Sequence, residues 1–198
     1  MTSKELPHNH FNHIFQLPPP LITPALEVSQ YAGHFLAEEP KAFRWTEFLS
    51  SIQRFPGNNL AMLEFRSESI NQHTTTIETA IDDIANLLVS GQGRVIELRN
   101  ALEKILTDSN KVDPTGSGWQ YRVHFAFVAE EEVEAPVVFH SLLATIRLEV
   151  EGGEESSWWN LQSGTLANLS VVIDVVELVI PEGFKDPMEV ASYAEGTS

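Results

Sequence analysis

Trp119–Val128 has the sequence WQYRVHFAFV, in which aromatic and aliphatic residues alternate with more polar ones. Alternation with a period of two is typical of a β-strand whose two faces differ. Arg122 and His124 lie on the wetter face of this strand. The apolar face comprises Trp119, Tyr121, Val123, Phe125 and Phe127.

Two more long strands are expected after this one. Val138–Val150 alternates in the same way, with Leu142, Ile146 and Leu148 on its apolar face. Thr165–Ile180 is almost continuously apolar from Val171 onward, so it needs cover on both faces. Because tight turns rather than helices connect these strands, we expect a largely antiparallel sheet. The sequence also predicts a short edge strand at Ile14–Leu17 and a strand at Leu60–Ser69.

Four helices are expected in the first half of the chain. Thr23-Pro24 is typical of an N-cap and first helical residue, which places one helix from there to Ala37. A second helix is expected over Phe43–Arg54, and a third and fourth over Thr75–Leu88 and Arg94–Leu106. The third helix opens with a capping box of Thr75 and Glu78. Its apolar stripe comprises Ile77, Ile81, Ile84 and Leu88.

The helices and strands together predict one α/β/α domain of three layers. Its central, largely antiparallel sheet is wrapped by helical hairpins, because a sheet with two apolar faces needs helices on both. The chain has 198 residues, which suits one domain over residues 1–198. We expect an ordered core at about residues 11–187 and flexible termini.

Composition excludes several classes of function. The net charge is −16, with 12 basic and 28 acidic residues, which argues against nucleic acid and against anionic lipid as partners. The chain has no cysteine, so disulfides and thiolate metal sites are excluded. No apolar segment of signal-peptide or transmembrane-helix length is present, so we expect a protein made soluble and stored in the cytoplasm or released.

Motifs for catalysis are also lacking, so an enzyme is not expected. The histidines near the N-terminus and the glutamates of 130–134 are better explained as a mobile terminus and a solvated turn than as metal sites, and no cofactor is expected. His124 and His140 lie on neighbouring strands, where ordinary sheet histidines are favoured over a pH-sensitive pair. Trp158 and Trp159 fit either a buried core or anchors at a bilayer interface.

Several segments resemble the family of Cyt insecticidal endotoxins and the mushroom cytolysin volvatoxin. They occur in the family's order over about residues 11–187, and the later ones are most similar to volvatoxin. They comprise Ile70-Asn71-Gln72, Trp119-Gln120-Tyr121-Arg122-Val123, Trp158-Trp159-Asn160-Leu161, residues 173–180 and Gly183-Phe184-Lys185.

The resemblance implies a water-soluble, pore-forming cytolysin that binds phospholipid, releases its helices, forms a homo-oligomer and inserts. The family leaves open whether strands or helices line the pore. We expect the apolar faces of Trp119–Val128 and Val138–Val150 to insert, with Arg122 and His124 then facing water. Zwitterionic membranes are the expected target, and the acidity of the chain argues against a glycosaminoglycan. The alternative is a non-lytic defence or binding protein of the same fold that holds a small apolar ligand between sheet and helices. Long amphipathic strands favour the first hypothesis, and the short link Thr107–Gly118 together with the acidity favours the second.

Overall fold

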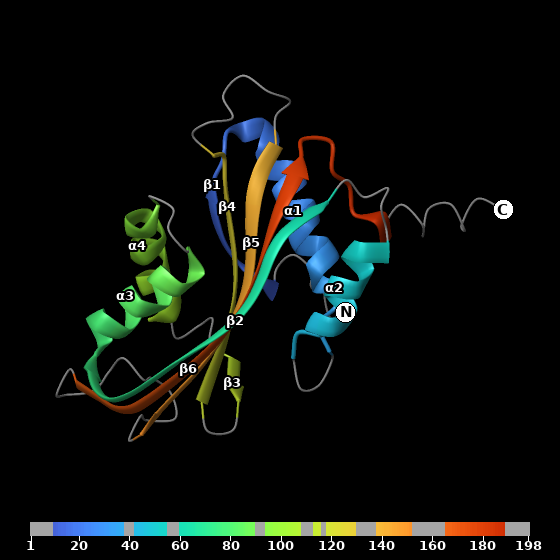
Figure 1. Ribbon diagram of the computed structural model, residues 1–198. Coiled ribbons are helices and arrows are strands. Elements are labelled where there is room, and N and C mark those ends of the chain that lie inside the picture. The colour runs from blue at the N-terminus through green and yellow to red at the C-terminus, as the bar shows by residue number, and fades with distance from the viewer. Residues whose placement is uncertain are drawn as a thin grey trace, which may run out of the picture. The chain divides into compact units, whose positions relative to one another are not determined.

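The computed structural model describes residues 10–37, 42–54, 60–89, 94–107, 113–115, 118–129, 138–151 and 165–188. Within these ranges the chain forms a six-stranded sheet in which the strands of the main path follow the order β1-β4-β5-β6-β2, and β3 pairs with β4 (Figure 1). The strands are β1 (Asn12–Gln16), β2 (Ala61–Thr76), β3 (Asp113–Thr115), β4 (Gly118–Phe127), β5 (Val138–Glu151) and β6 (Thr165–Pro181).

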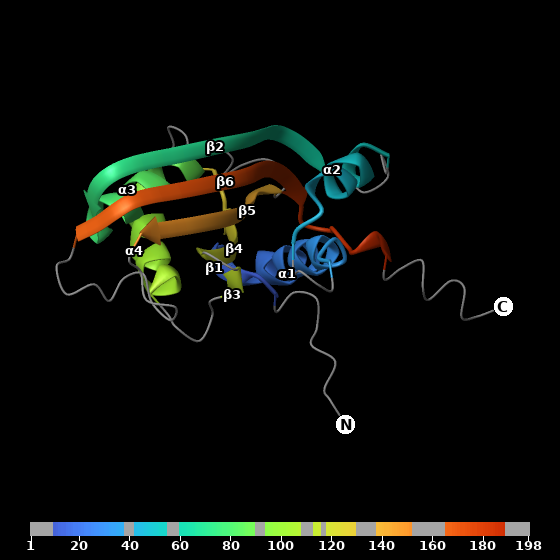
Figure 2. The ribbon, with the colours of Figure 1, turned by 90° about the horizontal axis from the view of Figure 1, so that it is seen from below.

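The strand directions agree with the hairpin connections expected from the sequence. Figure 2 shows β6 running opposite to both of its neighbours, β5 and β2. β3 pairs antiparallel with β4, with Pro114 opposite Trp119. This short strand lies in the link that the sequence predicted as a plain connection. The expected edge strand near Ile14 is confirmed as β1, which lies at one end of the order.

The chain divides into two compact units, and each long strand contributes one end to each. The first unit contains β1, α1 (Pro19–Gly33), α2 (Trp45–Arg54) and the last described residues. The α1 and α2 helices are joined by buried aromatic rings: Tyr31 packs on Phe48, and its hydroxyl lies 2.6 Å from that of Ser51. Burial raises the pKa of Tyr31 above its ordinary value.

The start of α1 corrects the expectation that Thr23-Pro24 begins this helix. The helix begins at Pro19, with Pro18 as N-cap, and Pro24 lies inside it. Prolines are tolerated at the start because first-turn amides have no helical acceptor, so their missing N–H groups cost nothing there. The helix also ends at Gly33 rather than Ala37.

The second unit contains β3 and two helices, α3 (Ile77–Leu88) and α4 (Val95–Leu106), which lie side by side (Figure 1). Both helices have close to the predicted bounds. β2 runs seven residues beyond the predicted Ser69 and leads directly into α3. It is an edge strand with mostly exposed side chains, including Leu63 and Phe65, which are 56% and 37% exposed.

Candidate functional site

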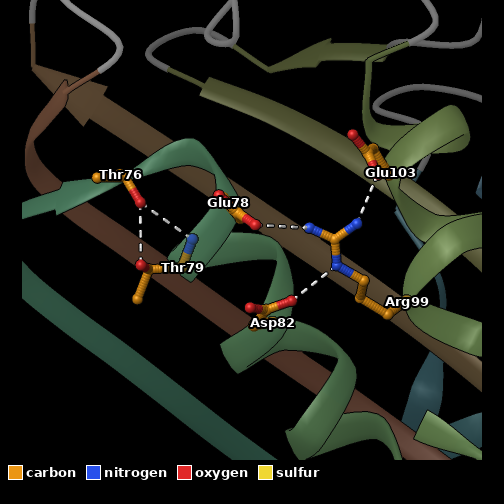
Figure 3. Close-up of polar contacts among 6 residues, drawn as sticks. All are labelled: Thr76, Glu78, Thr79, Asp82, Arg99 and Glu103. Atoms are coloured by element: carbon orange, nitrogen blue, oxygen red, sulfur yellow. Dashed lines mark hydrogen bonds and ion pairs between the residues drawn. The ribbon is translucent and has the colours of Figure 1, made fainter. Parts of the chain in front are cut away.

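The α3–α4 hairpin begins at a side-chain cap. Thr76 is the N-cap, and its Oγ1 accepts a hydrogen bond of 3.1 Å from the backbone N–H of Thr79 (Figure 3). The sequence placed the cap at Thr75, one residue too early. Since β2 continues through Thr76, the change from strand to helix occurs at a single residue, and the cap supplies a partner for an amide of the first helical turn.

The apolar stripe predicted for α3 is buried. Ile81, Ile84 and Leu88 are at most 2% exposed, whereas Ile77, at the helix start, is only half-buried. On α4 the buried set is Leu98, Leu102, Ile105 and Leu106.

α4 is fixed to β4 by a polar contact in this apolar surrounding. The hydroxyl of Tyr121 donates a hydrogen bond of 3.1 Å to the carbonyl oxygen of Leu106, at the last residue of α4. Trp119 and Val123 share the strand face of Tyr121 by their alternation, and they are 4% and 1% exposed. The helix therefore packs on the face of β4 that carries the aromatic residues.

One arginine joins the two helices. The Nε atom of Arg99 on α4 donates to Asp82 on α3 at 2.8 Å, and its Nη1 atom donates to Glu103 at 2.6 Å (Figure 3). Glu78 on α3 lies 3.7 Å from the same guanidinium. The hydrogen bond with Asp82 raises the pKa of Arg99 above its ordinary value, so the group stays charged. These contacts tie α3 and α4 into one hairpin.

Two side chains of the edge strand β2 hold α3. Arg66 donates to the carbonyl oxygens of Leu87 and Leu88, at 2.9 and 3.1 Å. These carbonyls lie at the C-terminal end of α3, where helix carbonyls lack intrahelical partners and the helix dipole favours a cation. Farther along β2, the amide of Gln72 donates to Asp83 at 2.8 Å.

The second unit also has a polar sheet face. On β5, the exposed residues Arg147, Glu149 and Glu151 alternate with buried apolar residues. On β6, Asp174 accepts a hydrogen bond of 2.6 Å from Ser67 of β2. The sheet of this unit therefore separates polar from apolar side chains along β5, which is the pattern required of a strand between lipid and water.

All eight residues predicted to insert into a membrane are buried in this folded state. Their exposed fractions range from 0 to 4%, so other parts of the fold cover all of them. The structure divides them between the two units, with Trp119, Tyr121, Val123, Ile146 and Leu148 in the second and Phe125, Phe127 and Leu142 in the first.

The expectation that Arg122 and His124 occupy a wetter face is wrong for this folded state. They are 7% and 0% exposed, because β4 is covered on both faces. The Nδ1 atom of His124 lies 2.5 Å from the hydroxyl of Ser29 on α1, and its Nε2 atom contacts the hydroxyl of Ser141 on β5. Burial lowers the pKa of His124 well below its ordinary value, and His13 lowers it further.

His124 and His140 belong to opposite faces of the sheet rather than to one pair. His140 stacks on Phe127, whose side of β4 is opposite to that of His124, and its Nδ1 atom lies 2.9 Å from Glu177. The predicted anchors Trp158 and Trp159 and the glutamates of 130–134 lie outside the described residues. In the described part of the chain, no group of three or more histidine, cysteine or acidic residues is placed to hold a metal ion.

Sequence reasoning missed the side chains that hold the hairpin. Arg66 and Gln72 lie on a polar strand, and the spacing of its residues does not show which helix lies beside it. No motif singles out Arg99. One available signal was the spacing of Arg99 and Glu103, which allows an ion pair across one helical turn. In the residues that the structure describes, no helix is long and apolar enough to cross a bilayer.

No protein-family profile matches the sequence, and no curated protein matches it. Among solved structures, the chain has the fold of the Cyt-type δ-endotoxins. A structure described as a delta-endotoxin matches with a TM-score of 0.67 and 15% identity, over 87% of this chain and 81% of that chain. The structure of the activated Cyt2Ba monomer from Bacillus thuringiensis subsp. israelensis has the same TM-score and identity, over 87% and 98%.

These similarities show the fold alone, and they confirm the predicted α/β architecture with a central sheet and helices. Similarity to volvatoxin stays a prediction. The Evf virulence factor matches with a TM-score of 0.40 and 12% identity, which is too low to support an argument.

Proposed function

We propose that this protein is a pore-forming cytolysin without enzymatic activity, which acts on zwitterionic phospholipid membranes. The observation that carries the proposal is the arrangement of the second unit. A helical hairpin covers the apolar side chains of long strands, while β5 keeps a row of polar side chains on its other face. The fold shared with Cyt-type δ-endotoxins supports the same conclusion.

The nature of the hairpin contacts explains why release would occur at a membrane and not in water. Fully burying a leucine or isoleucine side chain is worth roughly 1.5–3 kcal/mol in water. That contribution disappears when hydrocarbon replaces the sheet as the apolar neighbour, since lipid tails are as apolar as leucine. The hydrogen bonds from Arg66 and Gln72 to α3, and from Tyr121 to the end of α4, are then the contacts that remain to be broken.

Insertion of the strands would require more than one copy of the protein. In hydrocarbon each backbone N–H and C=O group needs a partner, so an open sheet edge is excluded. The sheet ends at β1 and at the long, mostly exposed strand β2. Strands from further copies are the partners that would satisfy these edges, which supports a homo-oligomer on the membrane.

A reversible crosslink between α3 and the sheet tests this mechanism. Gln72 and Asp83 face each other across the interface, and the chain has no native cysteine. In the variant Gln72→Cys/Asp83→Cys, a short reducible bis-maleimide linker should hold α3 on β2. We expect the linked protein to release no dye from phosphatidylcholine vesicles and to regain release on reduction.

The matched control places the same linker within the hairpin, in Asp82→Cys/Arg99→Cys. This linker joins α3 to α4, so the hairpin can still leave the sheet as one piece, and dye release should persist. Full lysis by a completely linked Gln72→Cys/Asp83→Cys protein would refute hairpin release. Failure of the unmodified protein to lyse neutral vesicles would instead favour a non-lytic protein of the same fold.

A further inference from the structure

A small hollow lies between β2 and β6 in the second unit, away from the hairpin contacts of Arg66 and Arg99. Its volume is about 190 Å³. Such a volume is below the roughly 300–1,000 Å³ of sites that hold drug-sized ligands, so it suits a single small ring. The lining residues are mostly polar and come from two short segments, Asn71, Gln72 and His73 on β2 and Asn168, Leu169 and Ser170 on β6.

Asn168 gives the hollow its shape. Its φ angle is 47°, a left-handed conformation that residues other than glycine adopt rarely, and that asparagine tolerates better than most. Its side chain contacts both neighbouring strands, through Glu151 on β5 and His73 on β2. An unusual backbone conformation persists only where the surrounding structure fixes it. Because Asn168 also links three strands, the fold holds this residue in one conformation.

The contacts of Asn168 determine which groups the hollow presents. Ionised Glu151 only accepts hydrogen bonds, so the amide nitrogen of Asn168 faces it and the amide oxygen faces His73. The Nδ1 atom of His73 therefore donates to that oxygen at 3.1 Å. In the neutral imidazole, Nε2 is then an acceptor.

The other polar side chains of the lining are uncharged. The side chain of Gln72 lies on the opposite face of β2 from Asn71 and His73, where its Nε2 group donates to Asp83. Asn71 and Ser170 contribute an amide and a hydroxyl, which can donate as well as accept.

We propose that this hollow binds one neutral sugar residue, free or at the end of a glycan. Sugar hydroxyls both donate and accept, which matches a lining of amides, a hydroxyl and an imidazole. An ammonium group only donates, and an anion would meet Glu151 and a chain of net charge −16. Sugar binding here is independent of membrane insertion, so its test does not depend on lysis.

The test uses the full-length protein labelled with ¹⁵N. Neutral monosaccharides, namely glucose, galactose, mannose and N-acetylgalactosamine, are titrated while side-chain amide signals are followed by NMR. Inorganic phosphate and ethanolamine serve as charged probes. We expect at least one sugar to shift the side-chain amide signals of Asn71 and Asn168 in a saturable way.

Two tryptophan substitutions test whether the sugar binds in the hollow. Asn71→Trp fills the hollow, whereas Ser69→Trp adds the same ring two residues earlier on the same face of β2, outside the lining. Sugar affinity should fall at least about tenfold in Asn71→Trp and remain unchanged in Ser69→Trp. His73→Ala, at an exposed position, should weaken binding without affecting the fold.

The outcomes separate the possibilities. Absence of saturable shifts with every sugar, or shifts that survive Asn71→Trp, would overturn the proposal. Shifts at these amides with ethanolamine or phosphate but not with sugars would indicate a charged ligand instead of a neutral sugar. This outcome would also overturn the proposal. If a sugar binds, binding of the protein is compared on phosphatidylcholine vesicles with and without a neutral glycosylceramide. Stronger binding to the vesicles that contain the glycosylceramide would identify a glycolipid as the source of the sugar.

Discussion

His124 is the clearest case of a single residue with a built-in pH dependence. It faces Ser29 on α1, Ser141 on β5, and His13 and Phe15 on β1. Burial lowers its pKa well below the ordinary 6.5, while the unfolded chain titrates near that value. Below pH 6.5 the unfolded state therefore binds more protons, and the free energy of unfolding falls as the pH falls.

We expect this loss to reach up to about 1.4 kcal/mol per pH unit below pH 6.5, measured by urea unfolding across the acidic range. His124→Gln should flatten the dependence in that window, even if it destabilises the protein at every pH. An unchanged slope in His124→Gln would show that other groups cause the acid sensitivity.

Gly118 permits a close approach of two strands. A Cβ atom at this position would lie 2.4 Å from the backbone oxygen of Leu148 and 2.8 Å from the Cγ atom of Glu149. Because a backbone carbonyl cannot rotate away as a side chain can, Gly118→Ala must separate β4 from β5. We expect a loss of about 1–3 kcal/mol in the free energy of unfolding.

Gly183→Ala is the matched control for this substitution, since a Cβ atom there would meet no atom within 4 Å. Thermal unfolding of the two variants checks the comparison. Equal melting temperatures for both would contradict the close packing of β4 against β5 at Gly118.

At the scale of elements, Arg99 determines whether α3 and α4 behave as one hairpin. Replacing it by methionine leaves Glu78, Asp82 and Glu103 without their shared cation. We expect severalfold faster amide hydrogen exchange in α4, with the largest effect at low ionic strength, where charges are least screened.

Arg147→Met is the control for Arg99→Met. Arg147 is also on the surface of the second unit, but its ion pair with Asp174 is longer, at 3.9 Å, and lies on the sheet rather than on the hairpin. Exchange in α4 should be unchanged in this variant. If Arg99→Met leaves α4 as protected as in the wild type, apolar packing alone holds the two helices together.

The elements show which features the sequence could predict. β4, β5, α3 and α4 have strong periodic patterns and β6 is a long apolar run, and the structure has all five close to the expected bounds. The second half of β2 was missed because residues 71–76 are polar and an edge strand needs no apolar alternation. α1 begins earlier than the expected Thr23-Pro24, because Pro19 and Pro20 occupy its first turn, where an amide N–H has no helical acceptor.

For the candidate site, the sequence predicted the apolar surfaces and their cover by helices, but not which side chains make the contacts. The stripe of α3 and the aromatic face of β4 follow from spacing. The burial of Arg122 and His124 does not, because alternation within one strand does not show which polar side chains another element covers. The same holds for Arg66 and Gln72, whose partners lie more than ten residues away in the sequence.

At the scale of the whole molecule, charge bears on how the protein would meet a membrane. With 12 basic and 28 acidic residues, electrostatic attraction to a bilayer is weak, so binding has to come from apolar side chains. In the folded state most of these side chains are buried, and the large exposed ones include Leu63 and Ile96. A conformational change is therefore central to the proposed lysis.

The most direct test of this central claim compares two adjacent residues of β5. Val150 belongs to the buried face and is 9% exposed, whereas Glu149 is exposed on the opposite face. A fluorescent dye is attached to Val150→Cys or to Glu149→Cys, and quenching is measured in phosphatidylcholine vesicles that contain brominated lipid. If the hairpin leaves and the covered face enters lipid, the bromine atoms quench the dye at position 150 and leave the dye at position 149 fluorescent. Equal quenching at both positions, or none at either on vesicles that the labelled protein lyses, would contradict this account.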